Sequence, residues 1–198
     1  MAIKLASIFF TMILVDNYVL AKFLGICPFL GASKKLDSAV GMSLAVTFVM
    51  VMATAATWPL YMGILAPNGL EYLQTIVFIL VIAILVQLLE NFLKKFIPAL
   101  YKSLGVYLPL ITTNCTILGV TILNLDNGYS FPESIVCAAG AGIGFLVAMV
   151  LFSGVRRKVE QAIVPECFKG LPITLVAAAM TSLSFMGFGG IVEAIFGV

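Results

Sequence analysis

Two short segments, each with one cysteine, have the composition of a ligand-bearing site. They read Cys27-Pro28-Phe29-Leu30-Gly31 and Cys115-Thr116-Ile117-Leu118-Gly119, so both follow the pattern Cys, any residue, Phe or Ile, Leu, Gly. Residues that interrupt helices, including Gly25, Pro109 and Asn114, lie beside them. The repetition favours paired ligands in broken helices at a pseudo-symmetry axis. The alternative, that both cysteines are small apolar residues buried for packing, stays open on spacing alone.

The chemistry that such a pair would serve is iron–sulfur binding, which usually requires four cysteine thiolates. This chain offers two in a repeated context, so it would form half a site, and a homologous partner chain would supply the other half. Cys137 and Cys167 lack a repeated context, and we interpret them as packing or incidental thiols. The chain has no histidine, which excludes imidazole metal ligands and haem held through histidine.

Composition defines the class of protein that would hold this site. The chain is 62% hydrophobic and 10% charged, with a mean hydropathy of +1.17. A soluble domain has about a quarter of its residues charged, because its surface faces water. The chain is therefore predicted to be an integral membrane protein in the lipid bilayer. Its net charge of +2 gives no indication of nucleic-acid binding.

Six apolar segments are long enough to cross a membrane as helices, for which roughly 20 residues are needed. The N-terminal one is interpreted as a retained first span, because no convincing signal-peptide cleavage site follows it. Continuous apolar runs favour an all-α protein over a β-barrel. The predicted spans are Ile3–Phe23, Ala39–Met62, Leu73–Phe92, Gly105–Asn124, Glu133–Gly154 and Leu171–Ala194.

The basic residues predict an orientation and a repeat. Every Lys and Arg except Lys4 lies at the end of the first, third or fifth span or in the stretch that follows it, so the positive-inside rule places both termini outside. With three spans in each half, 1–98 and 99–198 would be inverted repeats within a single membrane domain. Their first and fourth helices are expected to be broken, with Cys115 near the midplane and Cys27 in a broken helix or a re-entrant segment.

Two carboxylates are candidates for an ion path, because charged groups inside a membrane are costly and usually functional. Asp16 lies within the first predicted span, and Glu90 lies toward the cytoplasmic end of the third. The alternative for Glu90 is an interfacial residue paired with Lys94 one turn later. Gly140 and Gly144 resemble a dinucleotide fingerprint only superficially, and we interpret them as a face for close helix packing. Trp58 is interpreted only as an interface anchor.

Taken together, several segments resemble the RnfA subunit family over essentially the whole chain. The most specific are the stretches from Leu24 to Leu36 and from Tyr107 to Cys115, which contain the two cysteines. The remaining segments are Leu85-Val86-Gln87-Leu88-Leu89-Glu90, Lys169-Gly170 and Ser184-Phe185-Met186-Gly187-Phe188. The chain departs from the family at Asp16, where the family often has Asn.

This resemblance implies a six-span subunit of a complex that relays electrons between ferredoxin and NAD and couples this to Na⁺ or H⁺ translocation across a bacterial or archaeal cytoplasmic membrane. It implies a [2Fe–2S] cluster with Cys27 and Cys115 as half of its ligands, and a homologous sister subunit (RnfE-like) that supplies the rest. Glu90 matches an acidic position of the family. The chain would be part of an enzyme, a translocase, without being catalytic alone.

Three alternatives stay open. The chain could be an NqrE-type subunit of a Na⁺-pumping NADH:quinone reductase, a close relative of the same family. It could be a stand-alone transporter of inverted-repeat type, with Asp16 and Glu90 on the substrate path and structural cysteines. It could also be a scaffold that only docks partner subunits, in which case electron transfer would survive replacement of both cysteines.

Overall fold

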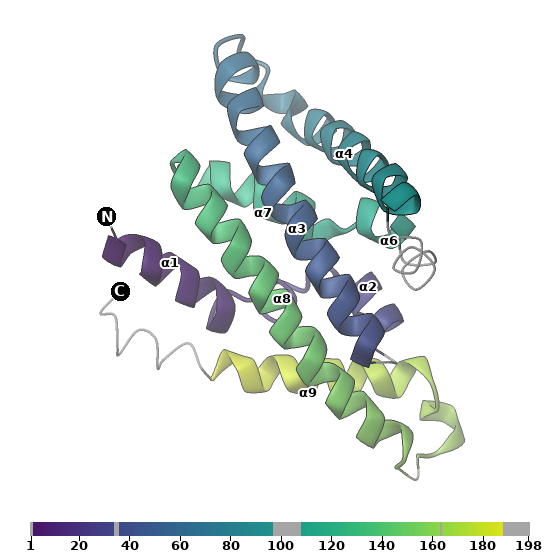
Figure 1. Ribbon diagram of the computed structural model, residues 1–198. Coiled ribbons are helices and arrows are strands. Elements are labelled where there is room, and N and C mark those ends of the chain that lie inside the picture. The colour runs from purple at the N-terminus through teal and green to yellow at the C-terminus, as the bar shows by residue number, and fades with distance from the viewer. Residues whose placement is uncertain (1, 34–35, 97–107, 163, 188–198) are drawn as a thin grey trace.

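The protein is seen in a computed structural model that describes residues 2–33, 36–96, 108–162 and 164–187. Within these ranges all elements are helical and there is no strand, as the continuous apolar runs predict (Figure 1). The α-helices are α1 (Ala2–Leu14), α2 (Ile26–Ala32), α3 (Leu36–Leu60), α4 (Gln74–Phe96), α6 (Leu108–Thr112), α7 (Cys115–Asp126), α8 (Phe131–Glu160) and α9 (Leu171–Met186); a π-helical turn, η1 (Tyr61–Leu65), and two 3₁₀ turns, η2 (Glu71–Leu73) and η3 (Glu166–Phe168), complete the described elements.

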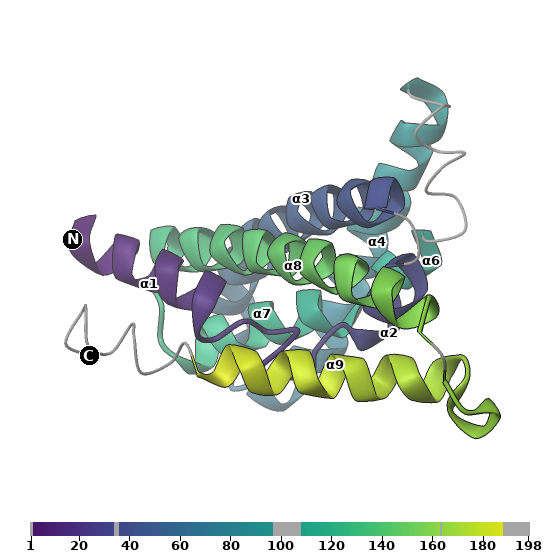
Figure 2. The same cartoon turned by 90° about the horizontal axis from the view of Figure 1, so that it is seen from below.

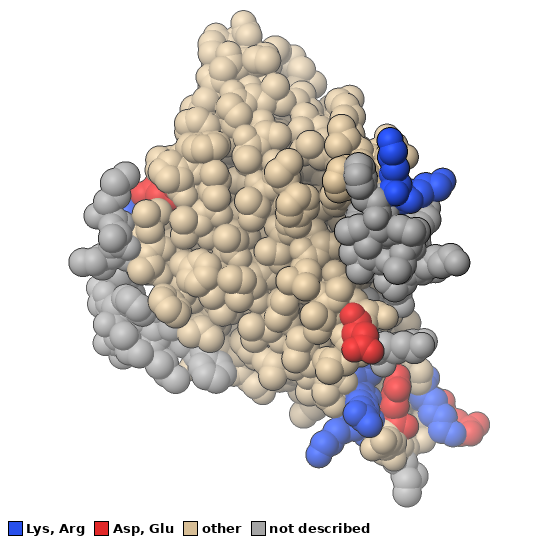
Figure 3. Space-filling view, in the orientation of Figure 1, with Lys and Arg blue, Asp and Glu red and all other residues tan. Residues whose placement is uncertain are grey.

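Three helical segments are long and apolar enough to cross a membrane: Leu36–Leu65, Glu71–Phe92 and Phe131–Glu160. They contain most or all of the predicted second, third and fifth spans, so the predictions of an all-helical membrane protein and of these three apolar helices are confirmed. The space-filling view agrees with this, because Lys, Arg, Asp and Glu gather at helix ends and leave a broad uncharged surface between them (Figure 3).

The predicted first span, Ile3–Phe23, is not one continuous helix, because α1 ends at Leu14. Asn17 explains the break. Its Oδ1 accepts hydrogen bonds from the backbone N–H groups of Val19 (3.1 Å) and Leu20 (3.4 Å), which gives the chain a local alternative to helix. After this irregular stretch the short helix α2 begins at Ile26.

The predicted fourth span is also interrupted, between α6 and α7 at Thr113 and Asn114. Its start at Gly105 lies outside the described residues, as does the end of the predicted sixth span, whose described part, α9, ends at Met186. The remaining shorter apolar helices, Lys4–Leu14, Leu110–Asp126 and Leu171–Met186, correspond to the first, fourth and sixth predicted spans.

The long helices α3 and α8 pack side by side and form the centre of the bundle (Figures 1 and 2). Helix α1 packs on α8, and α7 packs on α3; α4 lies along α3, and α9 lies along α8. The shared core consists of apolar side chains of both central helices, including Met42, Val46 and Met50 from α3 and Phe145, Met149 and Phe152 from α8.

Glycines on α8 allow α1 to approach closely. A Cβ added to Gly140 would lie 3.1 Å from the carbonyl oxygen of Phe9, and one added to Gly144 would lie 2.9 Å from that of Met12. The predicted packing role of Gly140 and Gly144 is therefore confirmed. Small residues matter in this setting because lipid is as apolar as the side chains, so helix association depends on close packing.

Gly144→Ala is expected to destabilise the protein by about 1–3 kcal/mol, because the new methyl group would press on the backbone of α1. The apparent melting temperature in detergent measures this. Gly154→Ala is the matched control on the same helix, since a Cβ there would meet nothing within 4 Å. It should be neutral or stabilise by up to about 1 kcal/mol, as Ala is the better helix former. Equal melting temperatures for the two variants would contradict the proposed packing.

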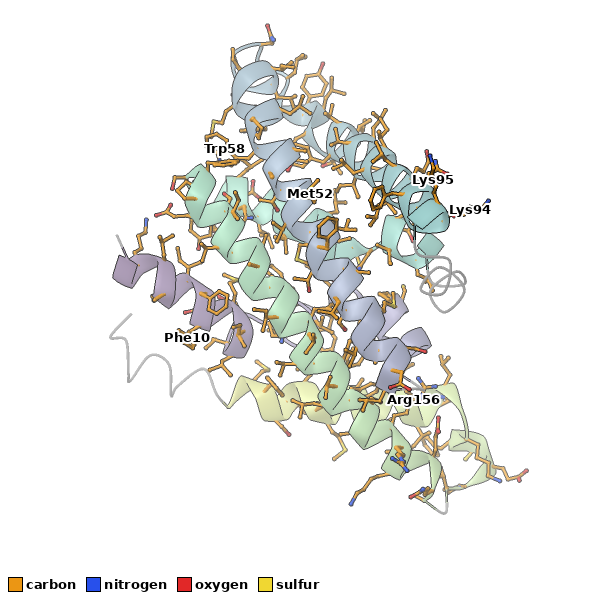
Figure 4. All side chains as sticks on the ribbon, viewed as in Figure 1. Phe10, Met52, Trp58, Lys94, Lys95 and Arg156 are labelled. Carbon is orange, nitrogen blue, oxygen red and sulfur yellow. The ribbon has the colours of Figure 1, made fainter. Side chains whose placement is uncertain are left out.

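Polar contacts tie the helix ends together. Lys4 forms an ion pair with Glu133 (2.8 Å), which joins the start of α1 to the start of α8. The indole N–H of Trp58 donates to the carbonyl oxygen of Tyr129 (3.1 Å), which joins the end of α3 to the same place (Figure 4). Trp58 is thus more than the interface anchor that the sequence predicts.

Candidate metal centre

The first cysteine lies in the first turn of α2, and its side chain is exposed. Gly25 precedes this helix in a left-handed conformation (φ 83°), which only glycine adopts without strain. A Cβ at Gly25 would also lie 2.1 Å from Oγ1 of Thr116, far inside van der Waals contact. The glycine beside Cys27 is therefore required twice, by its backbone conformation and by the proximity of α7.

The second cysteine is the first residue of α7, and its side chain is also exposed. Asn114 caps this helix by accepting a hydrogen bond from the backbone N–H of Thr116 (3.0 Å). The break between α6 and α7 is therefore built from a capping residue, and it places Cys115 where one helix ends and the next begins.

A hydrogen bond joins these two segments although they lie far apart in the sequence. The backbone N–H of Gly25 donates to Sγ of Cys115 over 2.9 Å. Beside this contact the side chain of Leu24 packs against Gly119, where a Cβ would lie 2.7 Å from Cδ1 of the leucine. The loop that leads to Cys27 thus covers the start of the helix that carries Cys115.

The exposure of both thiols distinguishes them from Cys137, which is fully buried in the core. Burial confirms the packing interpretation of Cys137, and Cys167 is an exposed thiol in η3, in line with its lack of a repeated context. Cys27 and Cys115 are exposed, so neither belongs to the buried core. Within the described ranges no group of three or more Cys, His, Asp or Glu side chains is placed to hold a metal.

The residues present fit half of an iron–sulfur site. Two exposed thiols are available on the surface of the chain, and a backbone N–H already donates to one of the sulfurs. Hydrogen bonds of this kind to ligand sulfurs help to set the reduction potential of an iron–sulfur cluster, because they stabilise negative charge on the thiolates.

The two candidate carboxylates lie on different elements. Asp16 follows the end of α1, is half exposed, and has its Oδ1 4.0 Å from Nζ of Lys22, whose ammonium also lies over the ring of Tyr18. Glu90 is half buried near the end of α4. Helices α1 and α4 lie on opposite sides of the α3–α8 pair (Figures 1 and 2), so the two carboxylates do not form one compact site.

Two residues that hold the cysteine segments in place are not evident from the sequence. Asn17 is buried, and its side-chain amide donates to the carbonyl oxygen of Gly144 on α8 (2.8 Å). Arg156 reaches from α8 to the end of α2 and donates to Oγ of Ser33 (2.8 Å) and to the carbonyl oxygen of Leu30. For Asn17, the only signal in the sequence is an amide side chain inside an apolar run. In the sequence, Arg156 is one of several basic residues that indicate orientation.

The fold and the site define a helical membrane protein that presents two thiols from interrupted helices. Comparison with known proteins agrees, because a family model described as "Rnf-Nqr subunit, membrane protein" matches residues 5–192. The chain belongs to the Rnf-Nqr family.

Several curated relatives are similar over nearly their whole length. The A component of the ion-translocating oxidoreductase complex of Syntrophotalea carbinolica is 54% identical over 180 residues, which cover 91% of this chain and 93% of the relative. The A component of the Na⁺-translocating ferredoxin:NAD⁺ oxidoreductase complex of Acetobacterium woodii is 53% identical over 186 residues, or 94% and 97% of the two chains. The resemblance to the RnfA family that the cysteine segments indicate is therefore confirmed.

Proposed function

We propose that this chain is the RnfA-type component of a membrane complex that transfers electrons between ferredoxin and NAD⁺ and couples the transfer to translocation of Na⁺ or H⁺. The observation that carries the proposal is the hydrogen bond from Gly25 to Sγ of Cys115, which unites two segments with exposed thiols. The name of the Acetobacterium woodii relative gives the reaction, and the names of both relatives describe ion-translocating oxidoreductase complexes. The chain is one subunit of a translocase, without catalytic activity of its own.

Within this complex, Cys27 and Cys115 supply half of the ligands of a [2Fe–2S] cluster, and a homologous sister subunit supplies the other two thiolates. When bound, the cluster would accept and pass on single electrons. The thiol of Cys27 is positioned by the first turn of α2, and the thiol of Cys115 is positioned by the capped start of α7. The Gly25 N–H stabilises negative charge on Cys115, because an unpaired charge in apolar surroundings is costly.

The proposed topology has six spans in two inverted repeats, with both termini outside the cytoplasmic membrane. The packing supports the repeat, in which α1, α3 and α4 of the first half correspond to α7, α8 and α9 of the second. Helix α1 packs on α8, and its counterpart α7 packs on α3. Likewise α4 packs on α3, and its counterpart α9 packs on α8. The ends also group as the topology requires. Lys4, Glu133 and Trp58 meet at one end, and Arg156 meets Ser33 at the other. At about 1.5 Å per residue, α1 is too short to span the hydrocarbon core alone.

The ion path is proposed to involve Asp16 and Glu90 at separate points. Glu90→Gln is expected to lower ion uptake by proteoliposomes several-fold while the iron content stays unchanged, because the substitution keeps the size of the side chain but removes its charge. Glu166→Gln, which neutralises an exposed carboxylate in η3, is the control. Wild-type ion uptake by Glu90→Gln would place Glu90 outside the ion path.

Deletion and complementation test the function as a whole. Membranes from a host that lacks this chain should lose ferredoxin-dependent NAD⁺ reduction and the ion uptake coupled to it, and the chain should restore both. Restoration of NADH-dependent quinone reduction instead would favour the NqrE-type alternative. Transport by proteoliposomes that contain this chain alone would favour the stand-alone transporter.

A further inference from the structure

Arg156 makes the contacts that fix the end of α2. Its Nη1 donates to Oγ of Ser33 over 2.8 Å and to the carbonyl oxygen of Leu30, and its Nε lies 3.2 Å from Oε1 of Glu160. The side chain is only 11% exposed, although it lies near the end of α8 (Figure 4). A guanidinium with several donors in one plane is suited to hold a carbonyl and a hydroxyl at once.

Helix α2 depends on such external support. It has seven residues, and its N-cap, Gly25, has no side chain to cap the first turn. Helices of this length are unstable alone, and the carbonyl groups of the last turn have no partners within the helix. A cation at this end satisfies these carbonyls and opposes their partial negative charge.

A second contact from α8 holds the same helix. Phe29 of α2 stacks on Phe152, with ring centroids 4.2 Å apart, one turn before Arg156. Cys27, two residues before Phe29, therefore belongs to a short helix that α8 holds at two points. A cavity of about 740 Å³ adjoins them, and Cys27 and Arg156 both line it. Arg156 and Cys27 thus face one cavity.

We propose that Arg156 is the positioning residue for Cys27: by holding the end of α2 it fixes where this thiol lies relative to Cys115, and its charge acts on the site across the shared cavity. The proposal rests on the proposed function, in which Cys27 is a cluster ligand. It assigns Arg156 a role that the next two basic residues of α8 do not share; Lys169 also lines the cavity, but it is exposed and pairs with Glu166. Arg157 and Lys158 follow it directly on α8, but their side chains are exposed.

The test compares Arg156→Gln, Arg156→Lys and the control Arg157→Gln in the chain purified with its sister subunit. The first readout is the rate at which a maleimide modifies Cys27 in iron-free protein, measured by mass spectrometry relative to exposed Cys167. The second is the EPR spectrum and reduction potential of the iron-loaded pair. A purely structural role for Arg156 would change stability without changing the potential.

We expect Arg156→Gln to change the relative modification rate of Cys27 several-fold and to lower the reduction potential, because a nearby positive charge favours the reduced, more negative cluster. Arg156→Lys keeps the positive charge, so its reduction potential should stay close to the wild-type value. The modification rate of Cys27 in this variant should still differ from the wild-type rate. Arg157→Gln should match the wild type in both. Wild-type modification rate and potential in Arg156→Gln would overturn the proposal.

Two further outcomes stay distinguishable. If Arg156→Gln does not assemble, Ser33→Ala takes its place, because it removes one acceptor of the guanidinium. It should change the modification rate of Cys27 several-fold less than Arg156→Gln is expected to, but in the same direction. An unchanged rate in Ser33→Ala would overturn the proposal. If the wild-type pair carries no iron, the proposed cluster fails, and the modification of Cys27 in the same variants still decides whether Arg156 positions this thiol.

Discussion

Replacing either Cys27 or Cys115 by serine is expected to lower the iron content of the complex with the sister subunit by at least about tenfold and to remove the cluster's EPR signal. Mutation of residues that only hydrogen-bond to the metal ligands typically lowers metal affinity 10–100-fold, so loss of a ligand itself should lower it at least as much. Because both thiols are exposed, the substitutions remove no core packing, and the pair should still assemble. Iron analysis and EPR of anaerobically purified protein measure the effect.

The matched control is Cys167→Ser, which also removes an exposed thiol but lies in η3. It should keep the full iron content and EPR signal. If both Cys27→Ser and Cys115→Ser keep the full signal, the two cysteines are not ligands. The stand-alone transporter, with Asp16 and Glu90 on its path, would then become the leading interpretation.

Gly25→Ala is expected to have the largest effect of any single methyl group in the described chain. A non-glycine residue at φ 83° costs about 1–2 kcal/mol in backbone strain. The added Cβ would also lie 2.1 Å from Oγ1 of Thr116, so α2 and α7 would have to separate. We expect a loss of stability above about 2 kcal/mol and the loss of most bound iron, because the hydrogen bond to Cys115 would break.

Gly128→Ala separates strain from steric contact. Gly128 has φ 65°, but a Cβ there would meet nothing within 4 Å. This variant should show only the backbone cost, about 1–2 kcal/mol, with full iron content. Apparent melting temperature and iron content, measured on both variants, test the account. Equal losses in the two would show that the approach of Gly25 to Thr116 does not matter for the site.

The features predictable from sequence depend on local composition. Long apolar runs without alternation are sufficient to predict the helices that contain Met50, Ile82 and Phe145, because a membrane requires this of a spanning helix. The two cysteine segments are recognisable because their residues repeat in the same order. The packing of Gly140 against α1 is predictable for a similar reason, since small residues four apart form one face of a helix.

The features that escape prediction depend on contacts between distant residues. A break in the first helix is expected from the sequence, but its position after Leu14 is set by Asn17, whose side chain bonds both its own loop and the carbonyl oxygen of Gly144 on α8. No local pattern distinguishes this amide from a polar residue inside a continuous span. In the same way, the sequence shows Arg156 as one of several basic residues, and only the fold brings it to the end of α2.

In the proposed half-site, the contact between Gly25 and Cys115 would link the two cysteine segments within one chain. A loop of the first half and a helix of the second half meet at this sulfur, so the two cysteine segments are joined within this chain. Preorganisation of this kind reduces the entropy lost when the other half of the site assembles. The scaffold alternative offers no reason for this arrangement of exposed thiols.

Iron and acid-labile sulfide, measured together with EPR on this chain purified anaerobically with its sister subunit, test the central claim most directly. The account predicts two irons and two sulfides for each pair, as a [2Fe–2S] centre requires, and an EPR signal that appears on reduction. Neither chain should retain this iron by itself, because each would supply only half of the ligands. A wild-type pair without iron, or full iron content in this chain alone, would contradict the shared site.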